Sequence, residues 1–263
     1  MGRLQDKVAI ITGGAKGIGY VTSNRFSTEG ASVVIVDMDK DAADKAAKEI
    51  NDAGGKAIAV VADLTKQEER VKIFKEAVDA FGKVDILINN AGWGCKTPFL
   101  EMDDEPFDRS INLNMKATYF MIKLACEQMI KQGTGGHIVS TSSTAAFQGE
   151  RNATIYSATK AAIIAFSKAI ALEVGEYGIT VNCVAPGFTR TNNNSHIPDA
   201  IDKNFLSITP TKRINVADDI VNGYLFLASD EARQITAQVL PIDGGYSGTR
   251  AMQVSQDSTM QVK

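Results

Sequence analysis

The chain has 263 residues, of which 44% are hydrophobic and 22% charged, a composition that can bury a large core and excludes global disorder. A formal net charge of −3 provides no basic field for a phosphate backbone, so nucleic acid is not expected as a partner. Three widely spaced cysteines and two histidines give no metal-ligand cluster, and no signal peptide or membrane-spanning segment is expected, which favours a cytoplasmic protein without a metal.

Short apolar runs rich in β-branched residues alternate with longer amphipathic segments along most of the chain. Strands are predicted at residues 8–11, 33–36, 58–61, 84–88, 137–140, 180–183 and 238–241. Helices are predicted from the first strand to about residue 29 and at 40–52, 66–81, 112–131 and 153–176. The strands lack strict alternation, as expected when helices cover both faces of a parallel sheet. This order predicts an α/β fold, a doubly wound parallel sheet of about seven strands in one Rossmann-like domain over residues 1–247.

A glycine-rich turn follows the first predicted strand directly and opens the first helix. It reads Thr12-Gly-Gly-Ala-Lys-Gly-Ile-Gly19, and no Gly-Lys-Ser/Thr follows, which excludes a P-loop. Glycines let the backbone approach a pyrophosphate, and the helix N-terminus supplies N–H groups and a partial positive charge. The turn therefore predicts a dinucleotide site, with candidate contacts at Gly13, Lys16, Gly17, Ile18 and Gly19.

An acidic residue, Asp37, ends the second predicted strand. Its carboxylate is suited to accept hydrogen bonds from the adenosine ribose hydroxyls and repels a phosphate at the 2′ position, which favours NAD. Lys16 is placed to reach such a phosphate, so NADP remains the alternative, although Met38 offers no second cation. Asp63 and Leu64 follow the third strand as candidates for the adenine edge, with a helix-entry cap as the rival interpretation of Asp63.

Asn89-Asn90-Ala91-Gly92 comes directly after the fourth predicted strand. It is either a turn that ends the strand or part of the cofactor cleft, because ligands bind at the carboxyl edge of such sheets, beside the switch in strand order. That position favours the cleft for Asn90, Ala91 and Gly92.

Tyr156 and Lys160 lie four residues apart in a predicted helix and therefore share one face. A phenol titrates near ~10 and exchanges protons poorly at neutral pH unless its anion is stabilised. An ammonium at about 4 Å and an effective dielectric of about 20 supplies roughly 4 kcal/mol, enough to bring the phenol near neutrality. The pair predicts an acid/base group, with a plain surface contact as the alternative.

Two later regions depart from the alternating pattern. Residues 188–212 are polar, contain prolines and are too long for an ordinary connection, which predicts a substrate lid, with a mobile surface loop as the alternative. The tail, 248–263, has a composition typical of disorder, and docking on a neighbouring subunit is the other interpretation.

Together, the glycine turn, the Asn89-Asn-Ala-Gly92 segment, a serine thirteen residues before the tyrosine, and Tyr156-x-x-x-Lys160 resemble the short-chain dehydrogenase/reductase family over residues 5 to about 247. The resemblance implies that Ser143 positions the substrate oxygen, Tyr156 is the acid/base, Lys160 holds the nicotinamide ribose, and Asn114 supports a proton path. Ser142 and Asn112 are the neighbouring alternatives for the serine and the asparagine.

The resemblance also implies that Pro186, Gly187 and Thr189 meet the nicotinamide carboxamide. It implies reversible hydride transfer between the nicotinamide and a small-molecule secondary alcohol or ketone. A hydroxysteroid or bile acid suits Asp37 and the long lid, while 3-oxoacyl reduction, sugar alcohols and diols remain open. A nucleotide sensor with a vestigial site and an epimerase or dehydratase are the competing classes. The helices at 112–131 and 153–176 are apolar nearly all round, which favours a homotetramer, the assembly common in the family.

Overall fold

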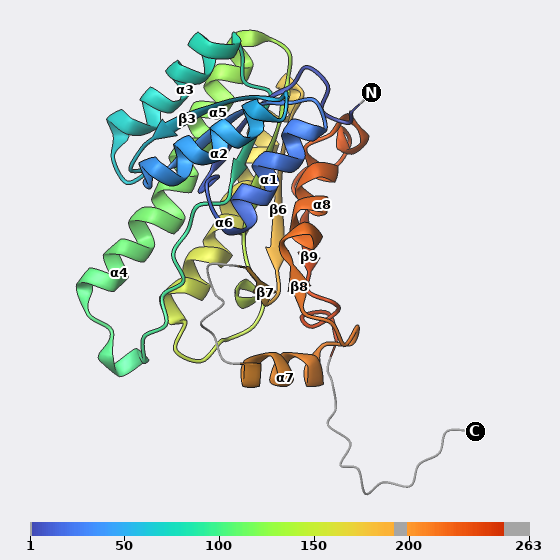
Figure 1. Cartoon of the computed structure of the whole chain (residues 1–263). Helices are drawn as coiled ribbons and strands as arrows, with labels where there is room; N and C mark the ends of the chain where they lie inside the picture. Colours follow the sequence, from blue (N-terminus) through green and yellow to red (C-terminus); the bar gives the residue numbers. More distant parts are fainter. Residues whose placement is uncertain (1, 192–198, 250–263) are drawn as a thin grey trace, which may run out of the picture.

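A seven-stranded parallel sheet forms the centre of the protein, with strand order β3-β2-β1-β4-β5-β6-β9 (Figure 1). The computed structural model describes residues 2–191 and 199–249. The strands are β1 (Val8–Thr12), β2 (Ser32–Asp37), β3 (Lys56–Val61), β4 (Ile86–Asn89), β5 (Gly136–Thr141), β6 (Ile179–Pro186) and β9 (Val239–Ile242). Each of the seven predicted strands is found in this sheet, so the doubly wound α/β fold is confirmed.

Helices cover both faces of the sheet. One face carries α1 (Gly17–Thr28), α2 (Lys40–Asp52) and α8 (Ala217–Leu227). The other carries α3 (Gln67–Phe81), α5 (Thr118–Gln132) and α6 (Thr154–Val174). Shorter elements are η1 (Phe99–Glu101), α4 (Asp104–Ser110), η2 (Ile111–Ala117), η3 (Thr144–Ala146), η4 (Gly175–Tyr177), α7 (Asp199–Ile208) and η6 (Asp230–Ala232), and a separate two-stranded sheet pairs β7 (Thr189–Arg190) with β8 (Asn215–Val216).

The two-sided burial explains why the strands read as continuous apolar runs. In β1, Ile11 packs into the core under α1, α2 and α8, while its neighbour Ile10 packs into the core under α3, α5 and α6. Val33 and Val34 of β2 divide in the same way, and all four side chains are fully buried. Side chains that face either layer of helices are mostly apolar, so the strands lack the alternation of apolar and polar residues that one solvated face would give.

The strand order creates a crevice at one edge of the sheet. The chain builds β1, β2 and β3 outward in one direction and then crosses over to place β4 on the other side of β1. Loops that leave the carboxyl ends of β1 and β4 therefore diverge, which opens space for a ligand between them. The predicted functional segments follow β1, β2, β4, β5 and β6 at this edge.

Two regions differ from the sequence expectations. The helix predicted at 112–131 begins earlier, because α4, the π-helical segment η2 and α5 form one continuous path from Asp104. The predicted lid at 188–212 contains β7 and α7 rather than a plain loop, and α7 lies beyond the carboxyl ends of the strands (Figure 1). Its residues 192–198, and nearly all of the tail at 248–263, lie outside the described residues.

One helix has the length and hydropathy of a membrane span, although no such segment was expected from the sequence. Within the described part of the chain, the helix Thr154–Tyr177 is long and apolar enough to cross a membrane by length and composition alone. In the structure, 33% of its most apolar 18-residue stretch is buried. In this fold α6 packs along β6 in the second helical layer. Its outer side is apolar too, since Leu172 is 87% exposed and Phe166 meets Tyr119 of α5 edge to face at 5.5 Å.

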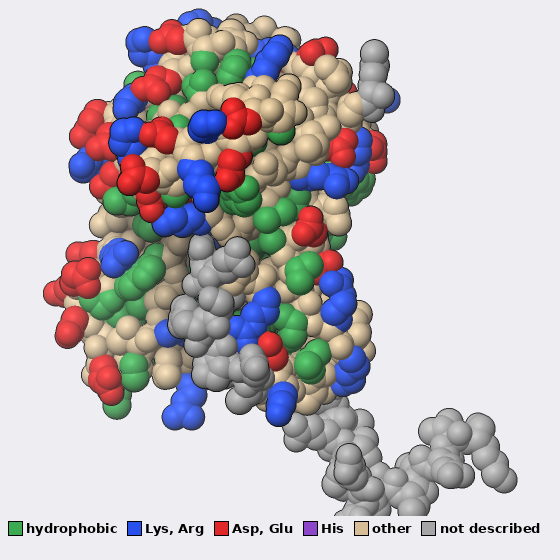
Figure 2. Space-filling model, in the orientation of Figure 1, with side chains coloured by type: hydrophobic (Ala, Val, Ile, Leu, Met, Phe, Trp, Pro, Cys, Tyr) green, Lys and Arg blue, Asp and Glu red, His purple; other side chains and the backbone are tan. Residues whose placement is uncertain are grey.

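Charged side chains of both signs cover the outer surfaces of α2 and α3. On the face shown in Figure 2, basic and acidic groups are interspersed over these helices, whereas acidic groups gather at the lower left, over α4. Several form exposed i,i+4 pairs, such as Lys48–Asp52 of α2 and Lys75–Asp79 of α3, each at 2.5 Å. Such pairs contribute a few tenths of a kcal/mol and keep the helical surface hydrated.

Candidate active site

The glycine turn is folded tightly between β1 and α1. Gly13 has a φ of +61° and Gly17 a φ of +54°, a region that side-chain-bearing residues rarely adopt. A Cβ atom on Gly19 would lie 1.9 Å from the Gly13 carbonyl oxygen. The turn therefore closes only because these positions are glycine, and it presents the N-terminus of α1 as the cradle that a pyrophosphate requires.

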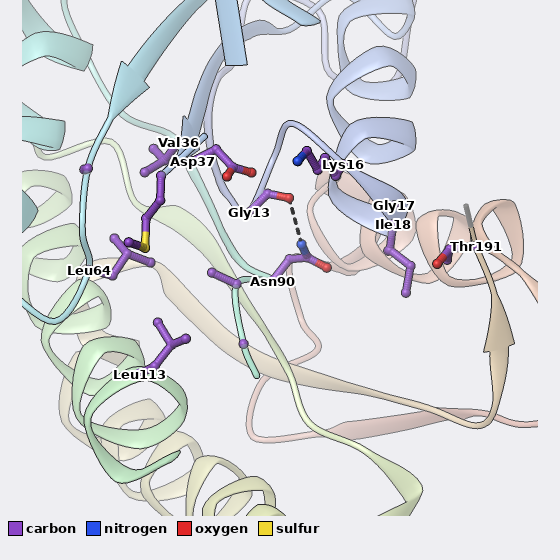
Figure 3. Close-up of a pocket in the computed structure, with 14 residues that line it drawn as sticks. Gly13, Lys16, Gly17, Ile18, Val36, Asp37, Leu64, Asn90, Leu113 and Thr191 are labelled. Atoms are coloured by element: carbon purple, nitrogen blue, oxygen red, sulfur yellow. Dashed lines mark hydrogen bonds between the residues drawn. The ribbon is translucent and has the colours of Figure 1, made fainter. Parts of the chain in front are cut away.

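Residues after β4 hold this turn in place. Asn90 Nδ2 donates to the carbonyl oxygens of Thr12 and Gly13 at 3.1 and 3.3 Å (Figure 3). The Thr12 hydroxyl in turn accepts from the backbone N–H groups of Asn90 and Ala91 at 3.0 and 3.1 Å. Sequence reasoning gave Thr12 no role, although its fixed place at the head of the turn was a usable signal. These bonds lock the β1 and β4 ends together across the crevice.

A cavity of about 390 Å³ opens beside the turn (Figure 3). Its lining includes, from the predicted cofactor set, Gly13, Lys16, Gly17, Ile18, Asp37, Leu64, Asn90, Ala91 and Gly92. Gly19 lies behind the turn. Asp63 accepts from Thr65 N and Thr65 Oγ1 at 2.9 and 2.7 Å, so its carboxylate stabilises the turn before α3, whose N-cap residue is Lys66.

Asp37 joins the end of β2 to the glycine turn. Its Oδ2 accepts from Ala15 N at 3.2 Å, and its Oδ1 accepts from Asp39 N at 3.1 Å. The carboxylate is thus oriented at the cavity wall, while Lys16 is paired with Asp39 at 2.5 Å. This end of the cavity presents an acceptor, as the sequence expectation for a ribose contact requires.

A second cavity, about 630 Å³, adjoins the first and shares Ile18, Asn90 and Gly92 with it. Most of its wall comes from two segments, the one that runs from the end of β5 into the start of α6 and the one at the end of β6. From the predicted site it includes Ser143, Tyr156, Lys160, Pro186, Gly187 and Thr189. The fold therefore brings the tyrosine, the lysine and both candidate serines, Ser142 and Ser143, to the place where the crevice continues past the glycine turn.

Aromatic residues that the sequence did not single out complete this second cavity. Phe188 and Phe205 stack with ring centroids 4.7 Å apart and an interplanar angle of 5°, and Tyr246 meets Phe205 edge on at 5.9 Å. All three line the cavity. They come from the link between β6 and β7, from α7 and from the chain after β9, so no local pattern could have grouped them.

The two candidate serines have different surroundings. Ser142 is 1% exposed, and its hydroxyl donates to the carbonyl oxygen of Lys160 at 2.8 Å, which pins the start of α6 to the end of β5. Ser143 accepts from Ala145 N at 3.1 Å and forms a hydrogen bond that lowers the pKa of Tyr156, and both serines line the cavity. Alternation along the chain turns the two hydroxyls in opposite directions.

Tyr156 and Lys160 lie on one face of α6, but their electrostatics differ from the sequence expectation. The Lys160 ammonium is 5.7 Å from the Tyr156 ring centroid and donates to the Thr141 carbonyl oxygen at 2.7 Å. Burial raises the pKa of Tyr156, and the Ser143 hydrogen bond offsets this only partly. The sequence led us to expect that Lys160 brings this phenol near neutrality, whereas in the ligand-free structure the pKa of Tyr156 lies above its ordinary value, because burial disfavours the phenolate.

Lys160 is itself strongly affected, since it is 3% exposed and burial lowers the pKa of its ammonium to about 8. The unfolded chain keeps this proton up to the ordinary pKa of 10.5. Between these two pKa values the unfolded state binds more protons than the folded state, so the free energy of unfolding increases as the pH rises.

We expect the free energy of unfolding of the ligand-free protein to rise by about 3 kcal/mol relative to that of Lys160→Met between about pH 8 and 10.5. Urea unfolding of both proteins across that range measures the difference and cancels the titration of other lysines. A difference that stays flat with pH would show that the folded lysine keeps its normal pKa.

Asn114 lies behind the cavities rather than in their walls. It is fully buried in η2, where Oδ1 accepts from Trp93 N at 2.7 Å and Nδ2 donates to Trp93 O at 2.9 Å. A Cβ atom on Gly92 would lie 3.3 Å from Asn114 Oδ1 and 3.4 Å from Lys160 Nζ. The π-helical turn thus places this amide against the loop after β4, close to the lysine, and π-turns of this kind are frequent at functional sites.

Within residues 2–191 and 199–249, no group of three or more histidine, cysteine, aspartate or glutamate side chains is arranged to hold a metal ion. The described cysteines are free and buried.

Comparison with known proteins connects this geometry to a family. The family described as enoyl-(acyl carrier protein) reductase matches residues 13–247. The 7α-hydroxysteroid dehydrogenase of Escherichia coli K12 is 39% identical over 244 residues, which covers 92% of this chain and 95% of that protein. The 3-oxoacyl-(acyl carrier protein) reductase of Thermotoga maritima is 36% identical and covers 92% of this chain and 98% of its own length.

A solved structure agrees with the sequence comparison. A 7α-hydroxysteroid dehydrogenase complexed with NADH and 7-oxo glycochenodeoxycholic acid aligns with a TM-score of 0.89 at 39% identity, covering 92% of this chain and 95% of that one. The 2,5-dichloro-2,5-cyclohexadiene-1,4-diol dehydrogenase of Sphingobium indicum is 40% identical over 245 residues, or 93% of this chain and 98% of its own. The chain belongs to the short-chain dehydrogenase/reductase family of oxidoreductases.

Proposed function

We propose that the protein is an NAD-dependent dehydrogenase that interconverts a secondary alcohol and a ketone, with Ser143, Tyr156, Lys160 and Asn114 as its catalytic residues. One observation carries the proposal: Ser143, Tyr156 and Lys160 line a single cavity that continues into the glycine cradle. The bound dinucleotide supplies the hydride acceptor or donor. Residues 1–247 form the dinucleotide-binding and catalytic unit in this proposal, with 188–212 as its lid.

The environment of each side chain supports a different catalytic role. Ser143 presents its hydroxyl in the cavity, where it stabilises charge that develops on the substrate oxygen. Tyr156 moves the hydroxyl proton. Burial opposes its ionisation, so the positive charge of Lys160 on the same helix face is needed to favour the phenolate. Asn114 fixes the loop at Gly92 and Trp93, next to the lysine.

The expected cofactor is NAD rather than NADP. Asp37 lines the cavity with its carboxylate held by two backbone N–H groups, and a negative charge there disfavours a 2′-phosphate. The hydroxysteroid dehydrogenase of similar structure was solved with NADH, which supports the same choice.

A bulky, largely apolar substrate fits the second cavity best. The stacked pair of Phe188 and Phe205, together with Tyr246, offers an aromatic wall to a ring system. A hydroxysteroid or bile acid is therefore our first candidate, in line with the 7α-hydroxysteroid dehydrogenase relative. Relatives that act on 3-oxoacyl groups and on a cyclic diol make those substrates the second candidates.

A panel of secondary alcohols, assayed with NAD⁺ by NADH absorbance, tests the proposal. It should include hydroxysteroids, 3-hydroxyacyl thioesters, sugar alcohols and cyclic diols. Turnover of at least one class is the expected result, with steroids foremost. Dinucleotide binding without turnover of any of them would instead support a nucleotide sensor.

Paired alanine variants distinguish the neighbouring serines. Ser143→Ala is expected to lower kcat about a hundredfold or more, because it removes a donor to the reacting oxygen. Ser142→Ala removes the bond to the Lys160 carbonyl and is expected to lower stability by about 1 kcal/mol, with a smaller loss of kcat. Steady-state kinetics and urea unfolding of both variants provide the comparison. Loss of turnover confined to Ser142→Ala would reverse the assignment.

The proposal extends to a homotetramer formed through α5 and α6. Both helices already bury one side on the sheet, yet their outer side carries Tyr119, Phe120, Phe166 and the 87% exposed Leu172. Sedimentation is expected to give about four times the chain mass of 28.2 kDa, and Leu172→Glu to dissociate the assembly. Val71→Glu, on the exposed side of α3, is the matched control. A monomeric wild-type protein would contradict the assembly.

A further inference from the structure

A second acidic residue stands at the entrance to the first cavity. Asp39 lies between β2 and α2, and its Oδ2 is 2.5 Å from the Lys16 ammonium. Lys16 and Asp37 are the charged residues in the cavity lining (Figure 3). We propose that Asp39 is a determinant of dinucleotide choice, because it occupies the ammonium group that would otherwise pair with a 2′-phosphate. This inference rests on the proposed function and concerns only the class of cofactor.

Asp39 is fixed independently of Lys16. Its Oδ1 accepts from Ala42 N at 3.0 Å and so caps the N-terminus of α2. Its own backbone N–H donates to Asp37 Oδ1 at 3.1 Å. The carboxylate is therefore held by the first turn of a helix, and the flexible lysine side chain comes to it. A pre-oriented acceptor retains a lysine better than one on a mobile side chain, because less conformational freedom is lost.

The neighbouring cations are engaged with other carboxylates and do little to neutralise the negative charge of Asp37. Lys40, the other cation at this corner, pairs with Asp44 on α2. Met38 follows Asp37 with 65% exposure and contributes no charge. The pairing of Lys16 with Asp39 raises the pKa of the ammonium and lowers the pKa of the carboxyl, so both stay charged. A 2′-phosphate must therefore displace Asp39 from Lys16 while it faces Asp37.

The size of the effect follows from the exposure of the pair. Lys16 is 49% exposed and Asp39 is 43% exposed, which limits what the ion pair contributes. Releasing Lys16 and removing one negative charge is expected to change NADP⁺ affinity about five- to tenfold rather than by orders of magnitude. NAD⁺ lacks the phosphate, so its affinity is expected to change less than about twofold.

Calorimetric titration with NAD⁺ and NADP⁺, without substrate, tests the inference on Asp39→Asn, Lys16→Gln and the double variant. Asparagine keeps the cap on α2, so the fold of the corner is preserved. Asp39→Asn is expected to tighten NADP⁺ binding about five- to tenfold, and the added Lys16→Gln to cancel that gain. Lys16→Gln alone is expected to change NADP⁺ affinity less than about twofold, since the lysine is already occupied.

Asp41→Asn is the matched control, because it removes one charge from the same turn of α2 but not the partner of Lys16. An equal gain in Asp41→Asn would reduce the effect to general electrostatics and overturn the inference. So would an unchanged NADP⁺ affinity in Asp39→Asn, or a large loss in Lys16→Gln alone. Failure of the wild type to bind either dinucleotide would overturn the proposed function as well, whereas intact NAD⁺ binding confines the failure to Asp39.

Discussion

Replacing Tyr156 by phenylalanine is expected to reduce kcat about a thousandfold while the dissociation constant for NAD⁺ stays within about twofold. The substitution removes one oxygen atom from a half-buried ring in the second cavity and leaves the glycine cradle untouched. No other phenol takes its place, because the Tyr224 hydroxyl is fully buried and bonded to Thr141 at 2.7 Å, and Tyr246 belongs to the aromatic wall. Steady-state kinetics with the best alcohol of the panel, together with calorimetric titration of NAD⁺, measure the two effects separately.

Tyr177→Phe provides the matched control, since it removes a phenol oxygen from a 47% exposed tyrosine in η4, directly after α6. It should leave turnover unchanged. Activity of Tyr156→Phe within about tenfold of the wild type would contradict the acid/base role. Loss of NAD⁺ binding in this variant would instead indicate that the ring supports the cofactor and not the proton transfer.

Most of the fold could be predicted from the sequence, because strands that are buried on both faces appear as continuous apolar runs. Ile10 and Ile11 must both be apolar, since they enter different cores, and the same constraint marked all seven strands of the main sheet. The glycine turn was equally readable, because steric exclusion at Gly19 allows no other residue. These features depend on local backbone geometry, which a sequence pattern reports well.

What the sequence missed depends on contacts between distant segments. Phe205 and Tyr246 meet at the second cavity only after α7 and the segment after β9 have folded against each other. Neither segment has a sequence pattern that predicts this contact. The pairing of Lys16 with Asp39 joins two loops in the same way. The pKa of Tyr156 was misjudged because desolvation depends on everything packed around the ring, whereas the spacing to Lys160 reports only one neighbour.

The catalytic roles of Ser143 and Asn114 remain predictions. Both serines line the second cavity, and their hydrogen bonds distinguish them, because Ser142 donates to the Lys160 carbonyl and Ser143 accepts from Ala145 N. Asn114 lies against Trp93 rather than in a cavity wall. A position permits a role without demonstrating it. Kinetics of single-atom changes, in which the fold is preserved, are therefore the decisive measurements.

Gly19→Ala is expected to abolish dinucleotide binding, with at least a hundredfold loss of NAD⁺ affinity, and to lower the free energy of unfolding by about 2 to 3 kcal/mol. The new methyl group would lie 1.9 Å from the Gly13 carbonyl oxygen and 2.8 Å from Asn90 Nδ2. Both atoms belong to the bonded junction of β1 and β4, so the turn has to open and the N-terminus of α1 moves away from the cradle. Calorimetric titration and urea unfolding measure the two losses.

Gly175→Ala separates this steric effect from the general cost of changing a glycine. A Cβ atom at Gly175 meets nothing within 4 Å, and its φ of −59° is helical, so alanine should keep stability within about 0.5 kcal/mol and leave NAD⁺ binding unchanged. If Gly19→Ala bound NAD⁺ as well as Gly175→Ala does, the turn could not be the pyrophosphate cradle. If it lost stability but kept affinity, the turn would be needed for packing alone, and the dinucleotide would have to be held elsewhere along the crevice.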